Sequence, residues 1–197
     1  PTVTAEALKA KIRIAEEKSA VKTGFHIGAT NNNAEMICSE LEREEKQFAA
    51  ALEHGTKEFQ KLIKHLGDYA YVGIHPSFSS YLNKNMIKEE IARLSDVLNR
   101  EVTISRQHFL RLSLPSSYQI LIELDITDDY TMGYASQAGF RAGYADTFKF
   151  FDLENDMKTK LNIHPFALMD GTMRDYLDLD VQESYEKAKK LIDEVKN

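Results

Sequence analysis

The sequence predicts an α/β fold, with a mainly parallel sheet and flanking helices. Candidate strands alternate with helices of ten or more residues, and this spacing requires crossover connections between parallel strands. Hydrophobic residues make up 43% of the 197 residues and charged residues 28%, a composition that can bury a core. No internal repeat, low-complexity tract or Pro/Gly/Ser linker interrupts the alternation.

The N-terminal part of the chain has a different pattern. Residues 4–22 carry apolar residues at helical spacing, and Gly24 follows as a stop. A short strand is expected over 25–29, and a strongly charged, solvent-facing helix over 34–54. The sequence therefore predicts a divergent helical N-terminal segment over 1–55 that contains one short strand.

The regular alternation occupies 56–197. In order, we expect a helix after Thr56, a strand over 69–74, a helix over 85–99, a strand over 101–105, a helix after Pro115, strands over 126–132, 148–153 and 161–168, and a helix after Asp180. Asp180 and Glu183 form a capping-box pair at the start of the last helix. The face that this helix is expected to bury consists of Val181, Tyr185, Ala188, Ile192 and Val195.

Charge and composition exclude several classes of protein. The formal net charge is -6 and no basic block is present, which argues against a nucleic-acid partner held by phosphate contacts. No apolar run reaches the roughly 18 residues that a membrane span needs. No signal peptide is visible, so a cytoplasmic location is expected. A single cysteine, Cys38, excludes an internal disulfide framework and a Cys-rich zinc site.

Two polar clusters follow candidate strands. His75 ends the first of these strands, and Pro76 forces an extended exit. Ser105-Arg106-Gln107-His108 follows the next strand along the chain. An imidazole at a strand end is well placed to bind a metal or move a proton, and an arginine can hold a carboxylate. The alternative is a histidine that is hydrogen-bonded in a turn, beside a surface ion pair.

A third cluster begins at Asp128-Asp129 and continues to the glycine-rich segment 139–143. Adjacent carboxylates alternate faces on a strand, so at most one of them points into a site. The alternative is a structural ion pair between Asp129 and Arg141. His164-Pro165 repeats the His-Pro pair of the first cluster, but its apolar flanks favour burial.

Five strings of residues resemble the polysaccharide deacetylase family with the NodB-homology fold (carbohydrate esterase family four), in a Bacteroidetes-type branch. Their order and spacing cover about 140 of the 197 residues. The strings are Val72-Gly73-Ile74-His75-Pro76-Ser77-Phe78, Ser105-Arg106-Gln107-His108-Phe109, Asp128-Asp129-Tyr130-Thr131-Met132-Gly133-Tyr134-Ala135-Ser136, Gly139-Phe140-Arg141-Ala142-Gly143 and Pro165-Phe166-Ala167-Leu168-Met169-Asp170.

The resemblance implies an incomplete (β/α) barrel of the NodB-homology type that removes acetyl groups from a sugar with the help of a divalent metal, often zinc. His75 matches the first metal histidine of the family's His-Ser/Thr-x-x-His motif. The second would fall at Ser79, a poor zinc ligand, so His108 is the candidate replacement, either as a metal ligand or as an acid. Arg106 and Asp129 complete the expected catalytic set.

Asp129 and Tyr134 match the region that lines the substrate groove, Tyr134, Phe140 and Arg141 are the expected substrate-binding residues, and an acetylated glycan is the expected substrate. The family's opening Asp-x-Asp motif and its closing histidine motif are not found, and the chain is read as the middle of such a domain. Open sheet edges then make self-association possible. The second hypothesis is a non-catalytic glycan-binding remnant of the same fold. An α/β hydrolase with a serine nucleophile is less favoured because no Gly-x-Ser-x-Gly elbow is present.

Overall fold

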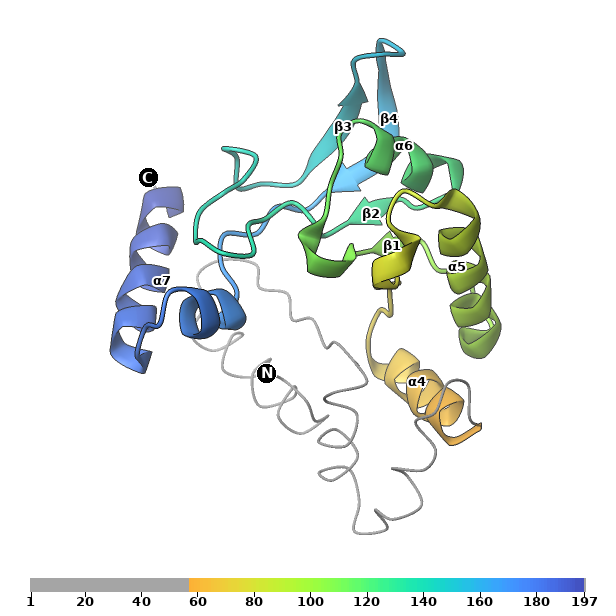
Figure 1. The fold of residues 1–197 in the computed structure, drawn as a ribbon, viewed down its shortest axis with the longest axis horizontal. Coiled ribbons are helices and arrows are strands. Elements are labelled where there is room, and N and C mark those ends of the chain that lie inside the picture. The colour runs from red at the N-terminus through yellow and green to blue at the C-terminus, as the bar shows by residue number, and fades with distance from the viewer. Residues whose placement is uncertain (1–56, 197) are drawn as a thin grey trace. The chain divides into compact units, whose positions relative to one another are not determined.

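The computed structural model describes residues 57–196. The chain divides into two compact units, 1–71 and 72–197. In the first unit the described part is helix α4, Lys57–Tyr69 (Figure 1). The elements expected over 4–54 lie outside the described residues. In the part of the chain that is described, no helix combines the length and apolar character needed to cross a membrane.

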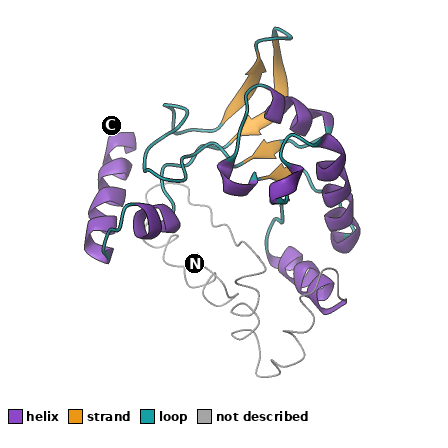
Figure 2. Ribbon diagram, in the orientation of Figure 1, coloured by secondary structure: helices purple, strands orange, loops and turns teal. Residues whose placement is uncertain are grey.

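The second unit is built on an open, mainly parallel sheet, which confirms the predicted α/β class. Its four strands are β1 Ile104–Ser105, β2 Asp128–Asp129, β3 Phe148–Asp152 and β4 Met157–Ile163, and they lie in the order β1-β2-β4-β3. The β1-β2 and β2-β4 pairs are parallel, whereas β3 and β4 form an antiparallel pair. Ile74 extends the parallel edge through a single bridge to Ser105. Figure 2 shows helices flanking this sheet.

Helix α5, Lys84–Leu98, confirms the expected helix over 85–99. Capping residues at both ends explain where this helix begins and ends. The Asn83 side chain accepts a hydrogen bond from the Met86 N–H, which satisfies one free donor of the first turn. Asn99 closes the other end in the left-handed conformation, with φ 50°, that asparagine tolerates.

Two further helices complete the unit. Helix α6, Ser116–Glu123, packs on β4 and buries Tyr118 and Leu121. Helix α7, Val181–Lys196, begins with the expected capping box: the Asp180 N–H donates to Glu183, and the Glu183 N–H donates to the Asp180 carboxylate. The helices expected after Pro115 and after Asp180 are therefore present.

The strands are shorter than the sequence suggests. Within 69–74 only Ile74 makes a sheet contact, and Tyr69 still belongs to α4. The strand expected over 126–132 has two residues, 128 and 129, in ladder pairing. The strand expected over 161–168 begins earlier, at Met157, and ends at Ile163. A proline lacks the N–H that a strand donates, so Pro165 stops this ladder.

The expected buried face of the last helix is wrong. Val181 is 88% exposed and Tyr185, Ile192 and Val195 are exposed as well. The core of the second unit instead lies around the sheet, where Leu121, Ile126, Leu161 and Ile163 are almost completely buried. Amphipathic spacing in α7 thus predicted the helix correctly but not what the helix covers.

Candidate functional site

The parallel strands bring the polar clusters to one edge of the sheet. His75 follows the Ile74 bridge, Arg106 follows β1, Tyr130 follows β2 and His164 follows β4. These strands run in the same direction, so the residues that follow them emerge at the carboxyl edge. Two backbone hydrogen bonds hold the residues that follow these strands in register. The Arg106 N–H donates to the Ile74 carbonyl, and the His164 N–H donates to the Asp129 carbonyl.

His75 and His108 form a pair at this edge. Their ring centroids are 5.0 Å apart, and the rings are tilted by 40°. The Nδ1 atom of His75 lies 2.7 Å from the Arg106 carbonyl oxygen. A carbonyl only accepts hydrogen bonds, so Nδ1 carries the proton and Nε2 presents its lone pair. Burial lowers the pKa of His75, as do the nearby His108 and Arg106, although the hydrogen bond to the Arg106 carbonyl acts in the opposite direction.

An aromatic cluster surrounds His108. It consists of Phe78 and Phe109, which stand edge to face with each other at 6.0 Å and with His108 at 6.1 and 4.7 Å. The side chains of Phe78 and Phe109 are exposed, and Phe109 adopts a left-handed backbone conformation with φ 54°. The Arg111 guanidinium lies 4.6 Å above the Phe78 ring. This aromatic cluster offers apolar ring surface directly beside the histidine pair.

Arg106 contacts the chain segments that follow β2 and β4. Its guanidinium donates to the Tyr130 carbonyl at 3.0 Å and to the Met169 sulfur at 3.1 Å, and it lies 4.3 Å above the Phe166 ring. Burial lowers its pKa, whereas the charge of the nearby Asp129 acts in the opposite direction. In this arrangement Arg106 connects the ends of β1, β2 and β4.

Asp129 lies inside the molecule, completely buried. Its carboxylate accepts hydrogen bonds from the Ser105 hydroxyl at 2.6 Å and from the Thr131 hydroxyl at 2.7 Å, and the Thr131 N–H donates at 3.0 Å. Burial raises the pKa of Asp129, and these hydrogen bonds and the charge of Arg106 offset part of that rise. The buried carboxylate therefore holds β1 and β2 together from the interior.

The expected substrate residues lie on the segment between β2 and β3. Tyr134 and Phe140 are partly buried there. Arg141 donates to the Leu110 carbonyl at 3.1 Å and to the Gly133 carbonyl at 3.5 Å. Among the described residues Arg141 makes no ion pair with Asp129, so the alternative of a structural pair between them is wrong. The contact with Leu110 places Arg141 next to the aromatic cluster.

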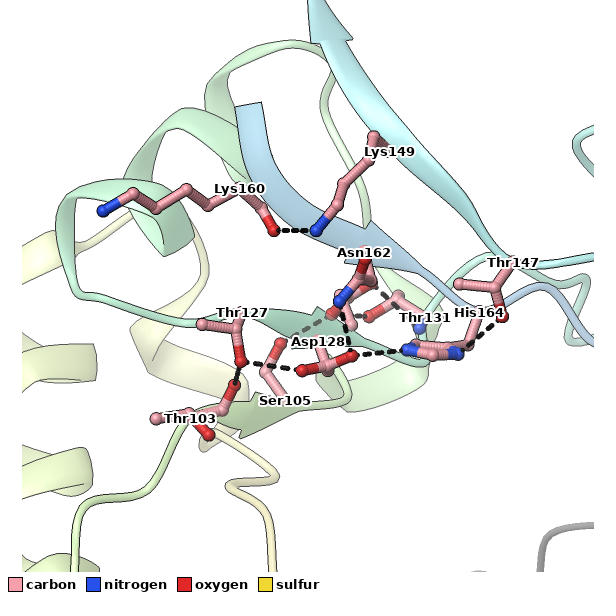
Figure 3. A network of polar contacts seen from close by, with 11 residues as sticks. Thr103, Ser105, Thr127, Asp128, Thr131, Thr147, Lys149, Lys160, Asn162 and His164 are labelled. Carbon is pink, nitrogen blue, oxygen red and sulfur yellow. Dashed lines mark hydrogen bonds and ion pairs between the residues drawn. The ribbon is translucent and has the colours of Figure 1, made fainter. Parts of the chain in front are cut away.

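A second group of polar side chains, around His164, was not predicted from the sequence. His164 hydrogen-bonds to the Asp128 carboxylate and to the Thr147 hydroxyl, as Figure 3 shows. The apolar flanks of His164 favoured burial, and its side chain is in fact 23% exposed. The signal that could have identified it was the adjacent pair Asp128-Asp129. With Asp129 buried inward, the alternation of a strand turns Asp128 to the other face, where His164 lies.

Comparison with family models finds none that matches this chain, and comparisons with curated proteins and with solved structures find no significant match either. Within residues 57–196 no group of three or more His, Cys, Asp or Glu side chains is arranged to hold a metal ion.

Proposed function

We propose that the chain belongs to a hydrolase that removes acetyl groups from a glycan with the help of a divalent metal, and that His75 and His108 are two of the metal ligands. The observation that carries this proposal is the pair of imidazoles with ring centroids 5.0 Å apart at the carboxyl edge of a parallel sheet. Ligands gather at this edge in open α/β sheets.

His75 and His108 would supply two of the three protein ligands that a catalytic zinc ion usually has. Histidines that bind metals usually donate their other ring N–H to a carbonyl or carboxylate, and the His75 Nδ1 contact with the Arg106 carbonyl has this form. Within the described residues, no hydrogen bond engages the ring nitrogens of His108. A bound zinc ion supplies a Lewis acid for the acetyl carbonyl. Further ligands would come from outside residues 57–196.

The chain's own residues supply the surroundings of such a site. The hydrogen bond to the Arg106 carbonyl fixes the tautomer and orientation of His75. The exposed rings of Phe78 and Phe109 provide apolar faces on which a sugar ring can stack. Arg141 links the segment that carries Tyr134 and Phe140 to the carbonyl of Leu110, the residue after Phe109. The substrate of the proposal is accordingly an acetylated glycan.

The open, mainly parallel sheet supports the proposal that the fold is an incomplete (β/α) barrel. In the proposed incomplete (β/α) barrel, parallel strands carry their functional side chains at the carboxyl edge, as His75, Arg106 and His164 are placed here. The exposed aromatic cluster also favours a second candidate function, glycan binding without hydrolysis.

Acetate release from an acetylated chitooligosaccharide tests the proposal. We expect release that stops with EDTA, returns with zinc, and falls in His75→Gln by more than the roughly 10- to 100-fold loss caused by removing a supporting residue. A matched control is His65→Gln, an imidazole on α4. Glycan binding without acetate release would identify the second candidate. Release that is unchanged by EDTA and by His75→Gln would overturn the metal assignment.

A further inference from the structure

His164 lies between a carboxylate and a hydroxyl. Its Nε2 atom is 2.7 Å from Asp128 Oδ1, and its Nδ1 atom is 2.9 Å from Thr147 Oγ1 (Figure 3). The three residues come from different elements: Asp128 belongs to β2, His164 follows β4 and Thr147 precedes β3. Residues 17 and 36 positions away from His164 along the chain thus meet at one imidazole.

The hydrogen bonds define the direction of proton movement. An ionised carboxylate only accepts, so His164 Nε2 carries the proton and donates it to Asp128. His164 Nδ1 is then the acceptor for the Thr147 hydroxyl proton. Partial burial raises the pKa of Asp128, but hydrogen bonds from Thr127, His164 and Asn162 outweigh it and hold the pKa below its ordinary value. Asp128 is therefore the ionised partner that this tautomer requires.

The imidazole is held rigidly. The Tyr130 ring stacks on it with centroids 4.3 Å apart and an interplanar angle of 6°. The Asp128 carboxylate is held in turn by Asn162 Nδ2 at 2.9 Å and by the Thr127 hydroxyl at 2.7 Å. Such support fixes the ring in the orientation that a general base needs.

The hydroxyl end of this arrangement belongs to an exposed residue. Thr147 is exposed, and the strand that follows it, β3, is an edge strand of the sheet. Asp128 and His164, by contrast, have side chains only 27% and 23% exposed. A reactant can thus reach the hydroxyl while the carboxylate remains sheltered.

We propose that Thr147 is the nucleophile of a second, metal-independent acyl-transfer site, with His164 as its general base and Asp128 as the carboxylate that orients the imidazole. The order of carboxylate, imidazole and hydroxyl is the one that activates hydroxyl nucleophiles in unrelated hydrolases. The class of substrate that this site would take is an ester of a small acyl group, such as acetyl. This site goes beyond the proposed function because it uses neither His75 nor His108.

The reaction proceeds in two balanced steps. Thr147 Oγ1 forms a bond to the acyl carbon while its proton passes to His164 Nδ1, and the carbonyl π pair moves onto the carbonyl oxygen. That pair returns, the bond to the leaving alkoxide breaks, and the alkoxide takes the proton from His164. Water, deprotonated by His164, then attacks the acyl carbon, and Thr147 Oγ1 leaves and recovers a proton. The overall change is ester plus water to acid plus alcohol.

p-Nitrophenyl acetate tests this site in the full chain with EDTA present. We expect a burst of nitrophenolate, and peptide mapping by mass spectrometry should place one acetyl group on Thr147. Thr147→Val, which keeps the side-chain shape, should lose the label and about 1,000-fold or more of the rate. Thr147→Ser should keep both. The matched control is Ser136→Ala, which removes another exposed hydroxyl and should change neither.

Asp128→Asn and His75→Gln separate this site from the proposed function. Asp128→Asn should slow acetylation because an amide no longer favours the required tautomer, whereas His75→Gln should leave acetylation intact. Wild-type protein without an acetyl group on Thr147 would overturn the inference, as would a label that persists at another residue in Thr147→Val. Peptide mapping of the wild-type chain decides the matter even if a variant does not fold.

Discussion

The buried carboxylate of Asp129 organises the interior beneath the sheet edge. It accepts three hydrogen bonds from Ser105 and Thr131 and lies near Arg106. A buried polar group whose partner is removed costs more free energy than the bond itself contributes. This residue was a catalytic candidate from the sequence, yet its complete burial keeps it from direct contact with solvent or substrate.

Removal of this carboxylate should destabilise the protein strongly. We expect Asp129→Ala to lower the free energy of unfolding by about 2–4 kcal/mol, because the donors of Ser105 and Thr131 lose their acceptor. Urea titration followed by circular dichroism measures the change. The control is Asp156→Ala, which removes a carboxylate that is exposed. An equal effect of the two substitutions would contradict this role of Asp129.

The raised pKa of Asp129 has a defined consequence for stability. Because the folded pKa lies above 3.8, the folded chain binds this proton more tightly than the unfolded chain does. The additional stability that comes from protonating Asp129 is therefore fully present below the unfolded pKa and is lost as the pH rises through the folded pKa. Urea titrations at several pH values should show wild type gaining stability relative to Asp129→Asn as the pH falls toward 3.8. A loss of wild-type stability relative to Asp129→Asn as the pH falls would contradict the direction of this pKa shift.

At the scale of the element, α5 begins where a side chain caps it. Asn83→Ala should lower the free energy of unfolding by about 1 kcal/mol, because the Met86 N–H loses its acceptor. Thermal unfolding measures the loss. The matched control is Asn85→Ala, an exposed asparagine inside the same helix, which should cost less. The reverse order of the two costs would contradict the cap.

The segment after β2 passes close to the segment after β4. A Cβ atom added at Gly133 would lie 2.2 to 2.5 Å from atoms of the Phe166 ring, over which Arg106 rests. Gly133→Ala should therefore cost about 1–3 kcal/mol through overpacking. Gly171→Ala is the control, since the nearest atom to its added Cβ is 3.6 Å away. Equal thermal stability of the two variants would contradict this prediction, because it would show that the Phe166 ring moves aside without loss of stability.

The sequence predicted helices better than strands. Helix α5 was expected because its apolar residues repeat at helical spacing along its whole length. A repeat of that length is not mistaken for the alternation of a strand. The two-residue strands β1 and β2 carry too few residues for alternation to define their limits. The antiparallel pairing of β3 with β4 was not anticipated, because the sequence pattern suggested helical crossovers between the strands.

Long-range partners were the least predictable part of the site. The clusters at His75, Arg106 and Asp128 were identified because parallel strands end at a common edge. Which side chains then meet depends on register. Alternation along β2 puts Asp128 and Asp129 on opposite faces, but that Asp128 is the one that meets His164 depends on the pairing of β2 with β4. Thr147 carried no local signal.

At the scale of the whole molecule, stability should be concentrated in the sheet. Leu161 and Ile163 of β4 are completely buried, whereas Val181 and Val195 of α7 are exposed. Helices with little buried apolar surface open at low free-energy cost. Hydrogen exchange followed by mass spectrometry should therefore show slow exchange in peptides from β4 and faster exchange in those from α7. Equal protection of the two would contradict this distribution.

We propose that His75 and His108 bind one metal ion together. Calorimetric titration of the EDTA-treated, desalted chain with zinc tests it most directly. We expect one zinc per chain for wild type and for His65→Gln, and loss of that binding in both His75→Gln and His108→Gln. Wild-type affinity in either of the last two variants would contradict it.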